Sequence, residues 1–364
     1  MQRDVIFEIT KDHLERGLHD IPVGYSSTSY IDPQKGLFYV GRSLNEIYSW
    51  DPLRVIFLLY RGREAAEKEL MAFAEYFDSI SPYALAAIET VKKMDPAKDP
   101  ILLFAMAIAF LEKIPPLELL AAMPAIAAGV ICHCLGCDPG YCKNLGPWLE
   151  DFACRLNIPS GNRPRFTDFL RLFINLYVDR GAGFLPAFAA KAAYSGRCSI
   201  PAALSCGLLA FSGERLGEPI AECYRLISQF NKGAIAFIDV FKTTIEEGRP
   251  LPGFGNLDFK GEDMRANIFY NYAEKYFAKE PLVVAALQFK TEASAFLKEH
   301  TRIRNPNPNA DAIAGALLSA CGFDQPRFFP LLSAMAGSMG IIVQLLHEDK
   351  KAKVYHPYYF YRSK

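Results

Sequence analysis

The chain has 364 residues, which is enough for two domains, and its forty basic and forty acidic side chains give a formal net charge of zero. This balance provides no electrostatic attraction to nucleic acid or to an anionic membrane, so neither is an expected partner. The start of the chain lacks the apolar stretch of a signal peptide, and nine cysteines, an odd number, do not indicate a secreted disulfide framework, so we expect a cytoplasmic protein with reduced thiols.

The first predicted element is a β-hairpin within residues 26–40. Residues with high β-propensity lie on both sides of the segment Asp32-Pro-Gln-Lys-Gly36, whose Pro and Gly favour a turn. Helices are predicted for almost all of the chain that follows. Apolar residues recur at helical spacing over residues 51–77, 100–112, 117–134, 168–177, 184–193, 201–211 and 219–230. A short hairpin followed by many helices predicts an all-α protein.

Two apolar stretches are long enough to be considered as membrane spans, residues 119–135 and residues 328–346. Both are rich in Ala, Gly and Ser, they contain Pro124 and Pro330, and the second also contains Gln344. Small residues favour close packing between helices. We therefore interpret both stretches as buried helices at a domain or subunit interface, with a membrane span as the alternative.

Four cysteines lie close together in the sequence, at Cys132, Cys134, Cys137 and Cys142. Such a density of thiols can bind zinc or an iron–sulfur cluster. A second pair of ligands at the usual longer spacing is missing, and Cys132 continues the apolar pattern of the preceding helix. We predict no metal here, and a bound metal is the alternative.

Residues 251–265 form the most informative segment, Leu-Pro-Gly-Phe-Gly-Asn-Leu-Asp-Phe-Lys-Gly-Glu-Asp-Met-Arg. Gly253 and Gly255 relax the backbone and remove side chains, so a ligand can approach the main chain closely. Lys260 and Arg265 provide cations for phosphate or carboxylate groups. The alternative is an ordinary Pro/Gly turn with solvated charges.

This segment resembles the Pro-Gly-Phe-Gly-His loop of citrate synthases, with Asn256 at the position of the histidine. Residues 17–47 are similar to the N-terminal hairpin of that family, and residues 309–315 resemble its Asn-Val-Asp-Phe-x-x-Gly motif. The resemblance extends over nearly the whole chain. It implies a two-domain multihelical fold with a short N-terminal β-hairpin, in which residues 1–218 and 314–364 form a large domain and residues 219–313 form a small inserted domain.

Citrate synthases condense an acyl-CoA with a 2-oxoacid, and the resemblance implies a catalytic role for two residues, Asp311 and Asn256. Asp311 occupies the position of the family's catalytic base, whereas a helix N-cap is the alternative for this residue. Asn256 replaces a histidine on the ketone side, where an amide can donate a hydrogen bond but cannot supply a proton. Leu216 occupies the position of the enolate-binding histidine. Loss of one such donor typically raises the activation free energy by about 2.7–4 kcal/mol.

The resemblance also implies residues that bind the acid. Arg180 replaces the substrate-holding histidine and could grip a carboxylate with two hydrogen bonds, unless it is merely an exposed charge at a helix end. Arg265 matches the family's substrate arginine, Arg215 lies beside the altered enolate position, and His356 occupies the place of an arginine that reaches into the partner subunit's site. We expect a small carboxylic acid as ligand.

Binding of CoA is implied by Gly253, Gly255 and Lys260, which keep the backbone and the cation of the family's CoA loop. No cofactor is expected beyond a CoA thioester as substrate or ligand. The tail of residues 355–361 is strongly aromatic, and the resemblance implies that it wraps a second subunit in a homodimer. A stacking platform for nucleic acid would need a basic groove that a neutral chain does not favour.

Two hypotheses of function follow. The first is a divergent enzyme that condenses or cleaves an acyl-CoA with a 2-oxoacid or a related carboxylic acid, and that has weak or no ordinary citrate synthase activity. The second is a catalytically silent acyl-CoA-binding homologue that acts as a regulatory or structural subunit. The sequence does not specify the acyl chain, the acceptor acid or the direction of the reaction.

Overall fold

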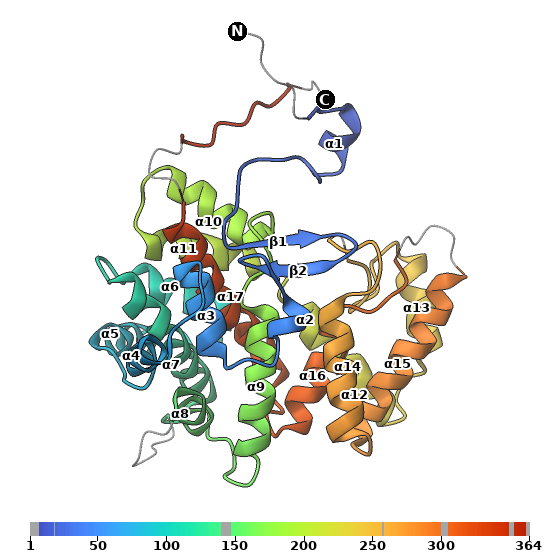
Figure 1. Cartoon of the computed structure of the whole chain (residues 1–364). Coiled ribbons are helices and arrows are strands. Elements are labelled where there is room, and N and C mark those ends of the chain that lie inside the picture. The colour runs from blue at the N-terminus through green and yellow to red at the C-terminus, as the bar shows by residue number, and fades with distance from the viewer. Residues whose placement is uncertain are drawn as a thin grey trace.

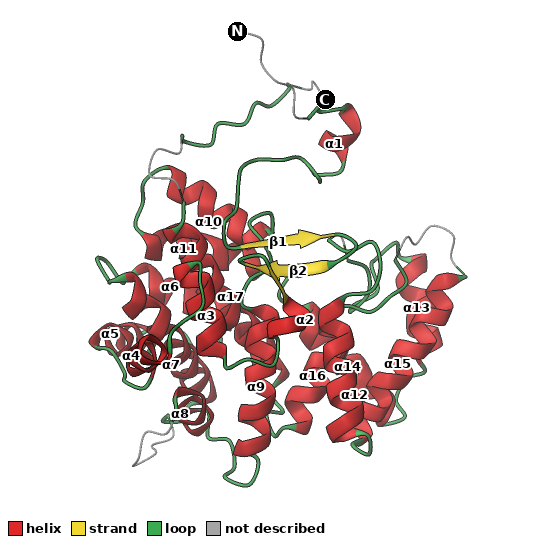
Figure 2. Cartoon of the chain, in the orientation of Figure 1, coloured by secondary structure: helices red, strands yellow, loops and turns green. Residues whose placement is uncertain are grey.

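Helices account for most of the structure, a computed structural model that describes residues 7–17, 19–139, 147–256, 258–299, 305–348 and 353–361. Figure 2 shows helices packed on one another, with a small antiparallel sheet lying across them. The predicted all-α class with an N-terminal hairpin is confirmed. The short elements at the start of the chain are α1 (Lys11–Glu15), α2 (Leu44–Ile47), β1 (Ser29–Asp32), β2 (Gly36–Tyr39) and β3 (Arg42–Ser43).

One group of helices forms the side of the molecule that contains the long apolar segments (Figure 1). Its members pack on one another and are α3 (Pro52–Arg61), α4 (Glu67–Phe77), α5 (Pro82–Val91), α6 (Pro100–Ala109), α7 (Pro116–Leu135), α8 (Trp148–Arg155), α10 (Leu185–Ser195), α11 (Ile200–Phe211) and α17 (Phe329–Leu346). The predicted helical segment 51–77 is two helices. Gly62 adopts a left-handed φ of 68° and ends α3, which glycine does without a steric penalty.

A second group of helices packs together on the other side (Figure 1). Its members are α12 (Pro219–Asn231), α13 (Phe237–Glu246), α14 (Met264–Phe277), α15 (Pro281–Lys298) and α16 (Asp311–Ala320). Helix α9 (Arg163–Tyr177) contacts α17 and α3 of the first group and α16 of the second. The end of α9 therefore lies where the two groups of helices meet.

Several helices begin with an acidic or hydroxyl side chain followed by proline. Asp51, Ser81 and Asp99 each accept a hydrogen bond from a backbone amide of the first turn, and a proline follows each of them. Such a side chain satisfies an amide that has no partner within the helix, and proline tolerates the first helical position. The starts of α3 and α6 coincide with the starts of predicted helical segments, whereas α5 carries the same signal and was not predicted.

The hairpin closes through the side chain of Asp32. Its Oδ1 accepts hydrogen bonds from the amides of Gln34 and Lys35, both at 2.9 Å, and Asp32 pairs with Gly36 in the register of β1 and β2. An aspartate that bonds to the amides that follow it stabilises a tight turn. The hairpin predicted around residues 32–36 is confirmed.

Buried polar groups attach the hairpin to the end of α9. The Tyr39 hydroxyl lies 3.0 Å from the carbonyl oxygens of Asn175 and Asp179, to which it donates. The Asn175 amide in turn donates to the carbonyls of Tyr48 and Trp50 at 2.9 and 2.8 Å. These hydrogen bonds satisfy the buried Tyr39 hydroxyl and the Asn175 amide nitrogen, and they join the hairpin and the segment after it to the end of α9.

The two long apolar helices form much of the core. Segments Pro116–Leu135 and Pro326–Leu346 have the length and composition of membrane spans, but 72% and 89% of their apolar windows are buried inside the protein. The second segment includes α17, which packs against α7, α9, α10 and α11. Their burial agrees with the interpretation of both stretches as packed core helices.

The predicted border between residues 313 and 314 falls inside α16, whose ten residues pack against α12, α14 and α15. A border at the start of α16 or after its end would leave the helix intact. The division of the chain into a large and a small domain stays a prediction.

Helix α17 approaches the end of α9 very closely at Gly340. A Cβ atom on this residue would overlap the carbonyl oxygen of Val178 and would lie 3.0 Å from the Cβ of Asp179. A backbone carbonyl cannot rotate away as a flexible side chain can. At Gly337, one turn earlier on the same helix, a Cβ atom would lie 3.7 Å from the carbonyl oxygen of Tyr177, which is an ordinary contact.

We predict that Gly340→Ala lowers the free energy of unfolding by up to about 2 kcal/mol, because overpacking typically costs about 1–3 kcal/mol and outweighs the roughly 1 kcal/mol that alanine gains over glycine in a helix. Gly337→Ala is the matched control, and its midpoint should stay equal or rise. Urea unfolding followed by circular dichroism measures both. Equal midpoints for the two variants would show that the contact at Gly340 is not close.

Candidate functional site

A pocket that is partly open to solvent lies where the two groups of helices meet. The end of α9 and the residues after it form one wall, the start of α16 contributes Asp311, and α10, α11, α12 and α17 complete the lining. The lining residues that carry polar side chains are Tyr177, Asp179, Arg180, Asp311, Ser333 and Gln344. The structure thus brings two of the predicted site residues, Arg180 and Asp311, into one pocket.

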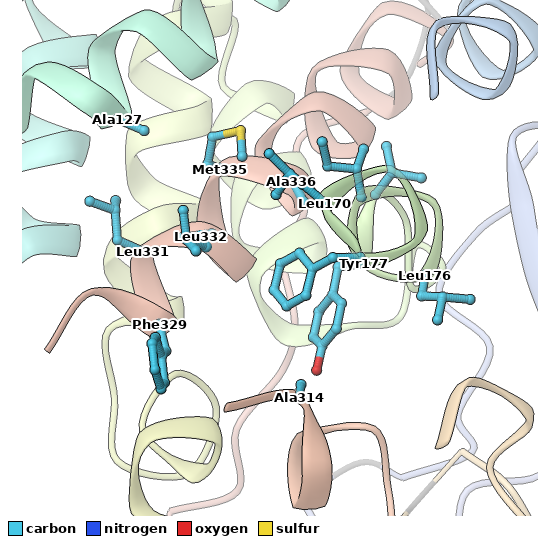
Figure 3. Packing of buried hydrophobic residues seen from close by; sticks show 14 of the residues in the cluster. Ala127, Leu170, Leu176, Tyr177, Ala314, Phe329, Leu331, Leu332, Met335 and Ala336 are labelled. Carbon is cyan, nitrogen blue, oxygen red and sulfur yellow. The ribbon is translucent and has the colours of Figure 1, made fainter. Parts of the chain in front are cut away.

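Asp311 makes its closest contact with Tyr177. The tyrosine hydroxyl donates to Asp311 Oδ1 at 2.5 Å, across 134 residues of sequence. Figure 3 shows the Tyr177 hydroxyl pointing toward the helix that carries Ala314, which is α16. A short hydrogen bond from a hydroxyl to a carboxylate orients the carboxylate in the pocket.

Asp311 does not act as a helix cap, which was the alternative for this residue. No side-chain cap is formed by Ala310, the residue before α16. The Asn309 side chain accepts the Asp311 amide at 2.9 Å, and the Asn309 amide donates to the carbonyl of Gly253 at 2.8 Å. The Asp311 carboxylate is therefore left for the pocket, and Asn309 ties the start of α16 to the glycine loop.

Burial raises the pKa of the Asp311 carboxyl above its ordinary value of 3.8, although the hydrogen bond from Tyr177 and the charges of Arg180 and Arg265 counteract this effect. Burial likewise raises the pKa of the Asp179 carboxyl, against hydrogen bonds that include the Gly181 amide. A carboxylate with a raised pKa is a stronger base when it is ionised.

Arg180 lies at the edge of the pocket with one fifth of its side chain exposed. Its Cζ atom lies 4.3 Å from the centre of the Phe184 ring, and its Nη2 lies 3.5 Å from Asp258 Oδ2. Burial, and then the nearby charge of Arg265, lowers the pKa of the guanidinium. Arg180 is thus not the exposed helix-end charge of the alternative interpretation, and its ion pair is long enough to leave it available to a ligand.

Arg265 is committed to a buried ion pair. Its Nε and Nη2 donate to the two carboxylate oxygens of Asp263 at 3.0 and 2.7 Å, and both side chains are almost fully buried. Burial would lower the pKa of the guanidinium, but Asp263 outweighs burial and raises it. Arg265 does not line the pocket, so its predicted role in binding the acid would require a different arrangement of this pair.

The glycine loop is pressed against the start of α16. Gly253 has a left-handed φ of 75°, and a Cβ atom there would lie 2.7 Å from Cys223 Sγ and 2.9 Å from the Cα of Ala312. Gly255 has a similar φ of 73°, but a Cβ atom would meet nothing within 4 Å. The first glycine is needed for packing and the second for backbone conformation.

Asn256 is used within the loop. Its Nδ2 donates to Asp263 Oδ2 at 3.1 Å, and its Oδ1 accepts the Asp258 amide at 2.9 Å. Lys260, by contrast, has an exposed side chain, while its amide donates to the carbonyl of Pro33 in the hairpin turn at 3.0 Å. The loop therefore keeps an exposed cation, and its backbone is held by the hairpin.

The remaining predicted residues lie apart from the polar end of the pocket. Leu216 lines its apolar side, whereas the neighbouring Arg215 is exposed and does not line it. His356 is exposed on the tail, where the Tyr355 ring stacks on Phe188 of α10 with centroids 5.9 Å apart. The structure does not bring Arg215 or His356 into this pocket of the same chain.

Four polar residues of the pocket were not predicted: Tyr177, Asp179, Ser333 and Gln344. Asp179 and Gln344 are joined by a hydrogen bond of 2.7 Å from Gln344 Nε2 to Asp179 Oδ1. Gln344 is the one strongly polar side chain in an otherwise apolar segment of nineteen residues, which was a detectable signal. Tyr177 carried no such signal, because aromatic residues are common on the buried face of a helix.

The cysteine cluster falls partly outside the described residues, which exclude Cys142. Cys132 is buried and its thiol donates to the carbonyl of Arg155 at 3.3 Å, while Cys137 is exposed. Among the described residues, no group of three or more His, Cys, Asp or Glu side chains could hold a metal ion.

Solved citrate synthases share this architecture. The enzyme from the thermophilic archaeon Thermoplasma acidophilum, in a ternary complex with carboxymethyl coenzyme A and oxaloacetate, superposes with a TM-score of 0.82 at 19% identity and covers 96% of each chain. Citrate synthase from Thermotoga maritima gives a TM-score of 0.82 at 17% identity, again over 96% of each chain. The protein therefore has the all-α citrate synthase fold.

Sequence comparison gives the family. The family described as citrate synthase, C-terminal domain, matches residues 17–358, so the chain belongs to the citrate synthase family. Mitochondrial 2-methylcitrate synthase of Aspergillus fumigatus is 23% identical over 94% of this chain and 83% of its own length. Peroxisomal citrate synthase of Saccharomyces cerevisiae is also 23% identical, over 94% of this chain and 82% of its own length.

We predict that Asp311→Asn stabilises the protein at pH 7. The native carboxyl holds its proton more tightly than the unfolded chain does, so ionisation opposes folding. This penalty is absent below the unfolded pKa of about 3.9 and is complete above the raised native pKa, at about 1.4 kcal/mol for each unit of difference. The gain in melting temperature should be present at pH 7 and should shrink toward pH 4.

Asp324→Asn is the matched control for this experiment. Asp324 is exposed and also accepts a tyrosine hydroxyl, from Tyr224, so the variant changes the same type of hydrogen bond without the burial. Differential scanning fluorimetry across pH 4–8 measures both variants. A gain for Asp311→Asn that does not change with pH would contradict the assignment of the effect to ionisation.

Proposed function

We propose that the protein binds an acyl-CoA thioester beside the glycine loop and uses Asp311 as the base in condensing or cleaving it with a carboxylic acid. One observation carries this proposal: the Asp311 carboxylate, with a raised pKa, faces the same pocket as the cation Arg180. Condensation of this type needs a base for a weakly acidic α-carbon and a cation for the acid.

In the proposed reaction, Asp311 removes a proton from the carbon next to the thioester carbonyl. Tyr177 donates to the same carboxylate, so it positions the base. The enolate carbon then attacks the ketone carbon of a 2-oxoacid, the resulting alkoxide takes up a proton from solvent, and water hydrolyses the thioester to release CoA. Arg180 holds the carboxylate of the acid during this step. Cleavage of a 3-hydroxyacyl-CoA reverses only the carbon–carbon bond formation: its hydroxyl loses a proton, the bond breaks to give the 2-oxoacid and the enolate, and Asp311 returns a proton to the enolate carbon.

Weak ordinary citrate synthase activity is part of the proposal. Leu216 cannot donate to an enolate oxygen, and the amide of Asn256 is already bonded to Asp263 and to the amide of Asp258. The fork of Arg265 is occupied by Asp263. A dicarboxylic oxoacid would thus meet fewer hydrogen-bond donors here than in the site that the family resemblance implies.

The same observations favour a second candidate, a catalytically silent homologue that binds an acyl-CoA and acts as a regulatory or structural subunit. We further propose a cytoplasmic homodimer with a large and a small domain in each subunit. Support for the dimer comes from the tail, where Tyr358, Tyr359, Phe360 and Tyr361 are 74–93% exposed and would be covered by a second subunit.

We predict that CoA and acetyl-CoA bind the purified protein and that Lys260→Ala weakens binding several-fold. The effect is modest because the attraction between an exposed cation and a ligand phosphate is screened by solvent. Isothermal titration calorimetry measures the affinities. Lys68→Ala, which removes an exposed lysine on α4, is the control and should bind as the wild type does. Absence of binding at millimolar CoA would remove the acyl-transfer proposal.

We predict that acetyl-CoA and oxaloacetate react more slowly than in a citrate synthase with both histidines, by a factor on the order of 10²–10³ for the missing enolate donor alone. With a suitable acid, CoA release should be measurable and should disappear in Asp311→Asn. Loss of thioester absorbance is the better readout, since the exposed cysteines Cys137 and Cys206 would react with thiol reagents. Thioester loss that is unaffected by Asp311→Asn would exclude this carboxylate as the base.

A further inference from the structure

One side of the pocket is a continuous apolar wall. It is formed by Leu208 and Phe211 of α11, by Leu216 before α12, by Ile220 of α12 and by Ile341 of α17. Leu208, Phe211, Ile220 and Ile341 are each less than 9% exposed. Apolar walls of ligand pockets bind apolar parts of ligands, and each buried methylene group favours binding.

The polar end of the pocket contains donors and acceptors without partners. Arg180 Nε, Asp179 Oδ2, Ser333 Oγ and Gln344 Oε1 are buried and have no hydrogen-bond partner among the described residues. Ser333 and Gln344 are only 5% and 3% exposed. Buried polar groups are normally satisfied, so four such atoms in one pocket, two of them on the donors Arg180 and Ser333, indicate a polar ligand group at this end.

The charges around this end admit a single carboxylate. Arg180 is the one cation among the described residues that line the pocket, and Arg265 is neutralised by Asp263. Asp258 faces Arg180 at 3.5 Å, and Asp311 and Asp179 also face the pocket. A second carboxylate on the ligand would meet these carboxylates without a cation of its own.

We propose that the acid bound here is a monocarboxylate with an aliphatic chain. Its carboxylate lies on Arg180 with Ser333 as an additional donor, and its chain lies along Leu208, Phe211 and Leu216. This inference rests on the proposed function, in which the acid is the acceptor of the acyl group. Leu216 then contributes to ligand binding, because a leucine packs favourably against an aliphatic chain whereas a polar side chain at this position would not.

The test is calorimetric titration of the full chain with 2-oxobutanoate, 2-oxohexanoate and 2-oxooctanoate, with oxaloacetate for comparison. Affinity should rise by about fourfold for each added methylene until the wall is covered, which corresponds to about 0.8 kcal/mol per methylene. Oxaloacetate should bind more weakly than 2-oxohexanoate. An affinity that is independent of chain length, or tightest for oxaloacetate, overturns the inference.

Two variants distinguish the contribution of the ligand's aliphatic chain to the affinity from that of its carboxylate. Arg180→Gln should weaken all members of the series by a similar factor, whereas Leu216→Asn should reduce the dependence on chain length. Leu85→Asn is the control, because Leu85 is 51% exposed on α5 and does not line the pocket. If Leu216→Asn does not fold, the wild-type series still decides the question.

A parallel titration with acetyl-, butanoyl- and hexanoyl-CoA distinguishes two sources of the aliphatic chain. Affinity that rises with the acyl chain of the thioester, and not with that of the free acid, assigns the wall to the thioester and overturns the inference. If CoA binds and the acid series is flat, this inference fails while the proposed function stands. If the acid series rises and CoA does not bind, the proposed function fails.

Discussion

The close approach of α17 to the end of α9 determines where the site residues lie. Gly340 lets the helix pass directly against the carbonyl of Val178, and a larger side chain there would overlap backbone atoms. This contact places Ser333 and Gln344 of α17 opposite Asp179 and Arg180. Because α9 also contacts α16, the same arrangement brings Tyr177 to Asp311. The pocket is thus a consequence of helix packing.

The buried carboxylates in this region differ in how well they are paired, and this difference decides which of them is available to react. The Asp263 carboxylate accepts from the side chains of Arg265 and Asn256 and also from the Arg265 amide at the start of α14, so both of its oxygens are hydrogen-bonded. Among the described residues, Tyr177 is the one side chain that donates a hydrogen bond to the Asp311 carboxylate, whose pKa is raised by burial. An incompletely compensated carboxylate costs stability, and such a cost is typical of groups that react.

Segments that are distant in the sequence hold the glycine loop. The hairpin turn accepts the Lys260 amide, and Met264 Sδ lies 3.0 Å from the amide of Leu37 in β2. On the other side, Asn309 bonds to Gly253. The glycine loop is therefore joined by hydrogen bonds to the hairpin on one side and to the start of α16, which carries Asp311, on the other.

The sequence by itself determined the hairpin, the positions of most helices and the family. Apolar periodicity, an aspartate or serine before proline, and the glycine loop are local patterns that depend on neighbouring residues only. The sequence also placed Asp311 and Arg180 among the candidates. It could not show that Arg265 is occupied by Asp263, that Asn256 is bonded within its loop, or that Arg215 points away from the pocket.

Only the tertiary structure decided those points, because hydrogen-bond partners depend on which faces of the helices meet. Tyr177 and Asp311 are 134 residues apart, and nothing in the local pattern of either residue indicates the other. The same holds for the apolar wall, whose residues come from α11, α12, α17 and the turn before α12. A sequence pattern reports which side of a helix is buried, whereas the chemistry of a pocket depends on what each buried side chain contacts.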